Sequence, residues 1–243
     1  MKLTVLGSGS KGNCYLLHNN EECLILEAGV PFSEVRHALK GDIRKVKACL
    51  VTHEHGDHIK YAGDMLAHGI RTYMTAGTMK AKQWRHYLPL MLETGIPAVH
   101  GRFTVLPFRT VHDAAEPCGF FINHPETGNI VFATDTAYVP NTFKAVTNML
   151  IECNYDPELL AARTDIPESL KDRIRESHQS IDTCIAAIKA NMDQGTLHHI
   201  VLLHISEGDG DPNNFKIRTM HDTGLITDVA TRGLEIDIKQ YPF

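Results

Sequence analysis

The sequence predicts a mixed α/β fold in which two mixed β-sheets pack face to face and helices cover the outer faces. Strand-like apolar runs fill the first part of the chain, and amphipathic helical patterns alternate with strands later. The number of expected strands is high for 243 residues. Length alone allows one large domain or two small ones. Because we find no repeat, low-complexity linker or block of like charge, we expect residues 1–243 to form a single domain.

The first part of the chain reads as short strands separated by turns. Strands are expected at 2–6, 14–18, 23–29 and 46–52. A turn rich in glycine and serine, GSGSKGN, follows the first strand. Ser33 is expected to cap a short helix that runs to Leu39, and a second helix is expected from Asp57 to about His68.

The second part mixes strands and helices. Its expected elements are strands at 71–75, 98–112, 118–123, 129–135, 149–154 and 198–206, and helices at 77–92, 142–149, 167–177 and 180–193. The segment HPETGN at 124–129 predicts a hairpin turn between two of the strands. The tail, residues 213–243, reads as strand, turn and strand.

Bulk composition narrows the class of protein. The formal net charge of −5 gives no sign of a general nucleic-acid binder, although bound divalent cations would change the local field. The six cysteines are scattered without a CxxC pair, which favours buried, reduced thiols and a cytoplasmic location. No signal peptide and no membrane-spanning run are visible, so we expect no membrane association.

The segment LVTHEHGDHIKYAG concentrates metal-binding side chains at the end of an apolar strand. His53 and His55 are two residues apart, so an extended chain points them the same way. Gly56 permits a tight turn, after which Asp57 and His58 open a helix. One loop can therefore serve two neighbouring metal ions, and imidazole and carboxylate are ligands that zinc and manganese accept.

Other strands deliver further candidates of the same kind. His112, Asp135 and His204 each follow an apolar run, in PFRTVH, IVFATD and HIVLLH. Taken singly, each would be read as a hydrogen-bonded core or cap residue. Together with the first motif, they favour metal ligands. His178 lies between two helices, where a helix cap is the alternative to a catalytic role.

The combined pattern resembles the metallo-β-lactamase superfamily of the HxHxDH type. The motif is THEHGDH, followed downstream by His112, Asp135 and His204, so the resemblance spans nearly the whole chain. Several further segments are similar to the YycJ/WalJ-type exonucleases of this fold: GSGSKGNCYLL, HDAAEPCGF, ATDTAYV, IECNYD, SLKDRI and SHQS.

The resemblance implies an αββα four-layer sandwich with a dinuclear site at one edge. One ion would take His53, His55 and His112, the other would take Asp57, His58 and His204, and Asp135 would bridge them. The ions would be Zn²⁺ or Mn²⁺, with iron also compatible, and a water between them would be activated to hydroxide.

Catalytic and substrate contacts are also implied. Asp57 and His178 are expected to take part in the reaction, with His178 contacting the scissile phosphate. The turn residues Ser8, Ser10, Lys11 and Asn13 are candidates for holding an anionic phosphate, although an ordinary turn would look the same.

Two positions depart from the family pattern, and neither is assigned a role. Glu27 stands in LEAG where the family has DAG, and Tyr155 stands where related sequences often carry a histidine. The segment KAKQWRH, with Lys80, Lys82, Trp84 and Arg85, is a candidate nucleic-acid contact. We favour instead a solvated helix face with one packed indole.

The function expected on these grounds is a metal-dependent phosphodiesterase, most specifically a 5′-to-3′ exonuclease acting on DNA. One alternative is a small-molecule hydrolase of the same fold, acting on a cyclic nucleotide, thioester or lactone, because fold alone does not fix the substrate. A second alternative is a non-catalytic module that keeps its metal for folding. A structural zinc site is usually closed by four protein ligands, whereas the expected ligands leave open positions.

Overall fold

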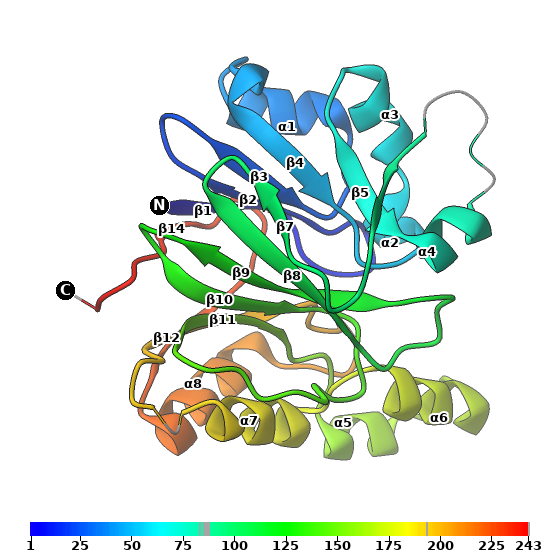
Figure 1. Ribbon diagram of the computed structural model, residues 1–243. Coiled ribbons are helices and arrows are strands. Elements are labelled where there is room, and N and C mark those ends of the chain that lie inside the picture. Colours follow the sequence, from blue (N-terminus) through cyan, green and yellow to red (C-terminus); the bar gives the residue numbers. More distant parts are fainter. Residues whose placement is uncertain (83, 85–87, 193, 243) are drawn as a thin grey trace.

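The computed structural model has four layers, with two β-sheets packed face to face between two layers of helices (Figure 1). It describes residues 1–82, 84, 88–192 and 194–242. The expected sandwich of two mixed sheets covered by helices is thereby confirmed. No helix in these described ranges is long and apolar enough to cross a membrane.

Among the described residues each sheet has seven strands joined by six pairings, of which three are antiparallel and three are parallel. The first sheet has the order β14-β1-β2-β3-β4-β5-β6 and contains β14 (Glu235–Asp237), β1 (Lys2–Gly7), β2 (Cys14–His18), β3 (Cys23–Leu26), β4 (Val46–Leu50), β5 (Thr72–Thr75) and β6 (Leu90–Leu92). The second sheet has the order β13-β12-β11-β10-β9-β8-β7 and contains β13 (Ile226–Val229), β12 (His199–Leu203), β11 (Val146–Glu152), β10 (Gly128–Ala133), β9 (Cys118–His124), β8 (Phe103–Arg109) and β7 (Ala98–His100).

Three apolar clusters hold the layers together. The central cluster joins side chains of both sheets, including Leu3, Phe103 and Phe132, all fully buried. The outer clusters pack helices on each sheet and bury Phe32 on one side and Phe215 on the other. The helices are α1 (Phe32–Ala38), α2 (Gly56–Ile59), α3 (Ala62–Ala67), α4 (Ala76–Ala81), α5 (Pro157–Ala162), α6 (Glu168–Ser177), α7 (Ile181–Ala190) and α8 (Pro212–Thr223), and the short 3₁₀ helix η1 is Ile43–Lys45.

Most of the expected strands and the two long amphipathic helices are confirmed. The helices expected at 167–177 and 180–193 are α6 and α7, and Ser180 caps α7 by accepting from the Thr183 amide. The expected hairpin turn joins β9 to β10 in antiparallel pairing. The six cysteines are all buried and free.

Two expected helices are wrong, one of them only in its second half, because short apolar runs show little of the hydrophobic periodicity that separates a helix from a strand. The segment 142–149 was expected to be a helix, but β11 begins at Val146 and pairs in parallel with β10 and β12. Every residue of β11 is buried, and a strand buried on both faces shows no alternation that would separate it from a helix.

The expected helix at 77–92 is wrong in its second half. Helix α4 ends at Ala81, and Leu90–Leu92 forms the edge strand β6, paired in parallel with β5. Residues 83 and 85–87 of this expected helix lie outside the described residues. The Trp84 indole, in contrast, packs against the outer cluster of the first sheet, as expected.

The tail prediction is wrong at its start, where residues 212–223 form α8 rather than a strand. Asp211 caps this helix by accepting from the amides of Asn213 and Asn214, Pro212 occupies its first turn, and Gly224 ends it in a left-handed conformation. The capping signals outweigh a weak apolar pattern that buries only Phe215 and Thr219. Strands β13 and β14 follow as expected.

The strand directions bring several carboxyl ends together at one edge of the sandwich. In the first sheet β1, β3, β4 and β5 point the same way, and in the second sheet β8, β10, β11 and β12 do so. The carboxyl ends of parallel strands meet at one edge of a sheet, which is where ligands bind in such folds. Loops that leave these strands therefore converge.

Candidate metal centre

The candidate residues come together at the edge where these carboxyl ends meet. The loop after β4 supplies His53, His55, Asp57 and His58, whereas the loops after β8, β10 and β12 supply His112, Asp135 and His204. All seven ligand candidates expected from the sequence thus lie in two adjoining groups. Asp135 and His204 have backbone φ angles of 41° and 52°, a strained conformation that such residues adopt at functional sites.

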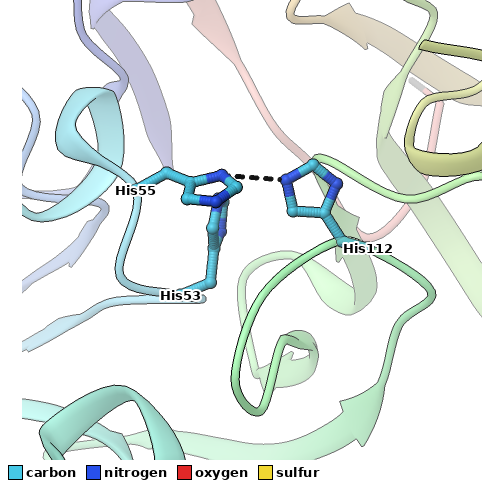
Figure 2. A group of neighbouring side chains, drawn as sticks. All are labelled: His53, His55 and His112. Carbon is cyan, nitrogen blue, oxygen red and sulfur yellow. Dashed lines mark hydrogen bonds between the residues drawn. The ribbon is translucent and has the colours of Figure 1, made fainter. Parts of the chain in front are cut away.

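Three histidines form the first group. The ligand atoms of His53, His55 and His112 lie within 4.8 Å of one another, and the ring centroids are 4.7–4.9 Å apart. Figure 2 shows the rings facing one another, with His55 Nδ1 3.1 Å from His112 Nε2. The donor set is that of a borderline divalent metal.

Hydrogen bonds fix the protons of two of these rings. The Thr52 hydroxyl donates to Glu27 at 2.6 Å, so it accepts from His53 Nδ1 at 2.9 Å and leaves the lone pair on His53 Nε2. His112 Nδ1 donates to the Ser177 carbonyl at 2.7 Å, which leaves its lone pair on Nε2. Fixing one nitrogen in this way orients the other toward a metal.

The second group combines carboxylates with histidines. Asp57, His58, Asp135 and His204 present ligand atoms within 4.8 Å of one another. Asp135 Oδ1 lies 3.2 Å from His58 Nε2 and 3.3 Å from His204 Nδ1, whereas its Oδ2 lies 3.8 Å from His112 Nε2. The two oxygens of Asp135 therefore face different groups.

Glu27 supports both groups from behind. It is fully buried, with φ of 69°, and its carboxylate lies 3.3 Å from His58 Nδ1 while it also accepts from the Thr52 hydroxyl. It contacts His58 directly and His53 through Thr52. Glu27 stands where the family has the aspartate of DAG, and its contacts are those of a carboxylate that orients the two histidine rings.

The two groups differ in protonation. Burial lowers the pKa of His53 and His112, so both rings favour the neutral form. For His58 and His204 burial acts in the same direction, but the Asp135 carboxylate and neighbouring acids outweigh it and raise the pKa, for His204 to about 10. Burial also opposes ionisation of Asp57, yet hydrogen bonds from His204 and His58 lower its pKa below the ordinary range.

Glu152 is a site residue that sequence reasoning missed. It is fully buried at the end of β11 and accepts from His178 Nδ1 at 2.6 Å and from the Thr136 amide at 2.9 Å, and it lies 3.2 Å from His204 Nδ1. With Asp135, His178 and His204 it forms a third group of possible ligand atoms. The signal was available, because Glu152 ends an apolar strand just as Asp135 and His204 do.

His178 lies beside these groups rather than at a distance from them. It ends α6, and its ring centroid is 5.1 Å from that of His112 and 5.7 Å from that of His204. Burial opposes its charge, but the Glu152 carboxylate raises its pKa above the ordinary value. The protonated ring can therefore donate a proton near neutral pH.

A cavity of about 240 Å³ opens next to His178 and His204. Its other walls come from the glycine and serine turn and from the loop after β12, and include Ser8, Gly9, Ser10, Lys11, Asn154 and Ser206. The Ser8 hydroxyl accepts from the His204 amide at 2.9 Å, which ties the turn to the metal centre. Lys11 is exposed and pairs with Glu207 at 2.6 Å.

Asn13 occupies a different position from its neighbours in the turn. It is fully buried, and its amide nitrogen donates to Asp57 Oδ2 at 3.1 Å while its oxygen accepts from the Gly9 amide at 2.8 Å. This geometry favours a role in holding the turn against the metal centre over direct substrate contact. Tyr155 forms a backbone bridge to Ser180 and is not among the grouped ligand atoms.

The residues fit a metal. His53 Nε2 is buried without a hydrogen-bond partner in the described part of the chain, although its lone pair points into a ring of imidazoles. A buried polar atom left unpaired is costly, and a metal ion would satisfy it. The histidine and aspartate groups are therefore able to bind metal.

Comparison with known proteins finds a matching family model and sequence relatives. Residues 27–205 match the family model described as "Beta-lactamase superfamily domain". Exodeoxyribonuclease YycJ of Bacillus anthracis is 30% identical over 85% of the chain and 83% of its own length. Exodeoxyribonuclease WalJ of Streptococcus pneumoniae is 30% identical over 99% of the chain and 93% of its own length.

A solved structure supports the fold independently. The metallo-β-lactamase fold protein YhfI from Bacillus subtilis aligns with a TM-score of 0.72, at 16% identity, over 97% of the chain and 98% of its own. At that identity the likeness concerns the fold alone. Taken with the family model and the two relatives, it shows that the chain belongs to the β-lactamase superfamily and is a hydrolase of the metallo-β-lactamase fold.

Proposed function

We propose that the chain is a dinuclear metal-dependent phosphodiesterase that degrades DNA from its 5′ end. The observation that carries the proposal is the pair of adjoining ligand groups beside a cavity walled by the glycine and serine turn. The two exodeoxyribonuclease relatives favour nucleic acid over other substrates. The 5′-to-3′ direction of degradation is inferred from the resemblance to the YycJ/WalJ-type exonucleases.

The ligands divide between two ions in this proposal. His53, His55 and His112 would hold one ion, Asp57, His58 and His204 would hold the other, and Asp135, with one oxygen facing each group, would contribute to both. Both Zn²⁺ and Mn²⁺ suit these donors, and iron is compatible with them. When bound, the ions lower the pKa of water to provide a nucleophile and neutralise charge on the phosphate oxygens.

The protein side chains would orient the substrate and move the proton. His178 faces the cavity with Nδ1 held by Glu152, so its other ring nitrogen is available to the substrate. A protonated His178 would hydrogen-bond the scissile phosphate or give its proton to the leaving 3′-oxygen. Asp57 stays ionised throughout, because its lowered pKa keeps the carboxylate charged.

The cavity beside His178 suits a terminal phosphate. Ser10 and Lys11 line it and are exposed, so Ser10 can contact an anion directly and Lys11 can do so by exchanging its surface ion pair with Glu207. Ser8 and Asn13 hold the turn in place through His204 and Asp57. Substrate contact is therefore assigned to Ser10 and Lys11, with Ser8 at the wall.

Two further assignments accompany this function. Residues 1–243 act as one unit, because ligands come from both sheets. A cytoplasmic enzyme is favoured by six buried free cysteines, since thiols persist in reducing compartments.

A degradation assay on end-labelled DNA tests the function. Duplexes and single strands with a 5′-phosphate or a 5′-hydroxyl are incubated with Mn²⁺ or Zn²⁺, with Asp135→Ala as control. Stepwise loss of nucleotides from the 5′ end, absent in the control, is expected. If the metal-loaded protein cuts no strand but hydrolyses a cyclic nucleotide, thioester or lactone, the small-molecule alternative replaces the nuclease.

His178→Ala separates the same two alternatives at the residue level. A phosphodiesterase that uses His178 on the leaving group would lose activity on DNA, whereas a thioesterase of this fold would not need it. Full activity of His178→Ala on DNA would remove His178 from the mechanism.

A further inference from the structure

A second cavity, of about 480 Å³, lies at the opposite edge of the first sheet. It is bounded by η1, by the first residues of β4, by the turn before β5 and by β7 with the turn after it. Its lining residues are Ile43, Arg44, Val46, Lys47, His68, Gly69, Ile70, Arg71, Val99, His100 and Gly101. None of them belongs to the metal centre.

The charge of this lining is of one sign. Arg44, Lys47 and Arg71 are cationic, and no acidic side chain is among the lining residues. In the described ranges, Arg44 is 3.6 Å from Asp42 in an exposed pair, whereas Lys47 and Arg71 lie in no ion pair. Three cations gathered in one hollow of a protein with a net charge of −5 are an unusual local field.

His100 adds an unpaired polar group to the same wall. Its side chain is buried, with 6% of the residue exposed, and packs against the Tyr73 ring at 4.4 Å between centroids. Its Nε2 has no hydrogen-bond partner among the described residues. Burial, with Arg71 nearby, lowers the pKa of His100, so the neutral ring can donate or accept a hydrogen bond.

We propose that this cavity binds the phosphate group of a nucleotide-sized anion. Guanidinium and ammonium groups without carboxylate partners recognise phosphate, and Arg71 can do so in a bidentate manner. A hollow of this volume falls in the range of small-molecule sites, which favours a mononucleotide over a bare ion. The proposal does not depend on the function assigned to the metal centre.

The two sites are too far apart to share one nucleotide. Lys47 is the second residue of β4 and His53 follows the end of that strand, so the extended chain between them spans roughly 20 Å at about 3.3 Å per residue. A bound nucleotide would therefore occupy a peripheral site and leave the metal centre open to substrate.

Calorimetric titration of the metal-loaded protein with dAMP, and separately with inorganic phosphate, tests the proposal. We expect a binding step whose affinity falls as the salt concentration rises. In Lys47→Ala/Arg71→Ala the affinity should fall by roughly 10-fold or more, because charge-assisted hydrogen bonds are lost. Lys144→Ala, which removes an exposed cation from the turn before β11, should leave the step unchanged. Binding of nucleotide at the metal centre would appear as a separate step, insensitive to the double variant.

Three outcomes would overturn the proposal: no step beyond that of the metal centre, an equal affinity in the double variant, or binding of a DNA duplex without binding of dAMP. If the alanine double variant unfolds, Lys47→Gln/Arg71→Gln keeps more of each side chain, removes both charges and gives the same readout.

Discussion

The two ligand groups of the metal centre are built in different ways. In the histidine group, burial lowers the pKa of His53 and His112, so these two rings favour the neutral form. In the carboxylate group, Asp135 raises the pKa of His58 and His204 against the effect of burial, and hydrogen bonds from these two rings lower the pKa of Asp57. The first group therefore offers lone pairs such as that of His53 Nε2, whereas the second is a network of paired charges.

This difference predicts how many protons each group gives up when it binds metal. In the second group the raised pKa values of His58 and His204 favour protonated rings, which pair with the carboxylates of Asp57 and Asp135. In the first group the lowered pKa values of His53 and His112 favour neutral rings. Metal binding should therefore release protons from the second group and few from the first.

Asp135→Ala should have the largest effect, because one oxygen of Asp135 faces each group. Loss of a residue that only orients a metal ligand lowers metal affinity or activity by roughly 10–100-fold. Loss of a ligand shared by both ions should exceed that range and abolish hydrolysis. Metal content per chain, measured by mass spectrometry of the metal-loaded protein, should fall for both ions. Retention of two ions would show that Asp135 does not bridge the groups.

The next largest effect should come from breaking one group at a time. His112→Ala should remove the ion of the histidine group, and His204→Ala that of the carboxylate group, with one ion retained in each variant. Hydrolysis should fall strongly in both. If either single variant loses both ions, the groups bind cooperatively and are not separate sites.

Glu152→Gln should have a smaller effect, because the amide keeps an oxygen for the Thr136 and Gln179 backbone amides but loses the charge that pairs with His178. We expect roughly 10–100-fold lower activity with both ions retained. On the alkaline side of the pH profile, activity should decline at a lower pH than in the wild type, since the pKa of His178 falls. An unchanged profile would limit Glu152 to a structural role.

The smallest effect should be on the stability of the chelator-treated protein as pH changes. A raised pKa means that His204 contributes stability fully below about 6.5 and loses it as pH rises toward about 10. His53, whose pKa is lowered, contributes with the opposite sign and loses its share as pH falls below 6.5. Thermal unfolding should show declining stability above pH 6.5, and His204→Gln should flatten that decline.

Residues that share a short spacing or end an apolar strand were predicted from the sequence and its family resemblance, whereas pairings made only by the fold were not. His53 to His58 form a recognisable spacing, and each of His112, Asp135 and His204 ends an apolar strand. Glu152 carries the same signal, but its partners are 26 and 52 residues away along the chain, so pairing with His178 and His204 becomes visible only when β11 and β12 lie side by side.

In the fold, the amphipathic helices α6 and α7 were expected correctly. The cap expected at Ser33 was wrong, because α1 begins at Phe32 behind Pro31 and no side chain caps it. Strand β11 was misread at its start because burial on both faces removes alternation, and α8 because its caps rather than its apolar pattern define it. The cation-lined cavity was not foreseen, since Lys47 comes from β4, Arg71 from the turn before β5 and His100 from β7 of the other sheet.

The metal content of the wild-type chain tests the central claim most directly. The protein would be stripped with chelator, reloaded with excess Mn²⁺ or Zn²⁺, freed of unbound metal and weighed intact by native mass spectrometry. Two ions per chain, falling to one in His112→Ala, is the result that the two adjoining groups predict. A wild-type chain that saturates with a single ion would contradict a dinuclear centre and the phosphodiester chemistry assigned to it.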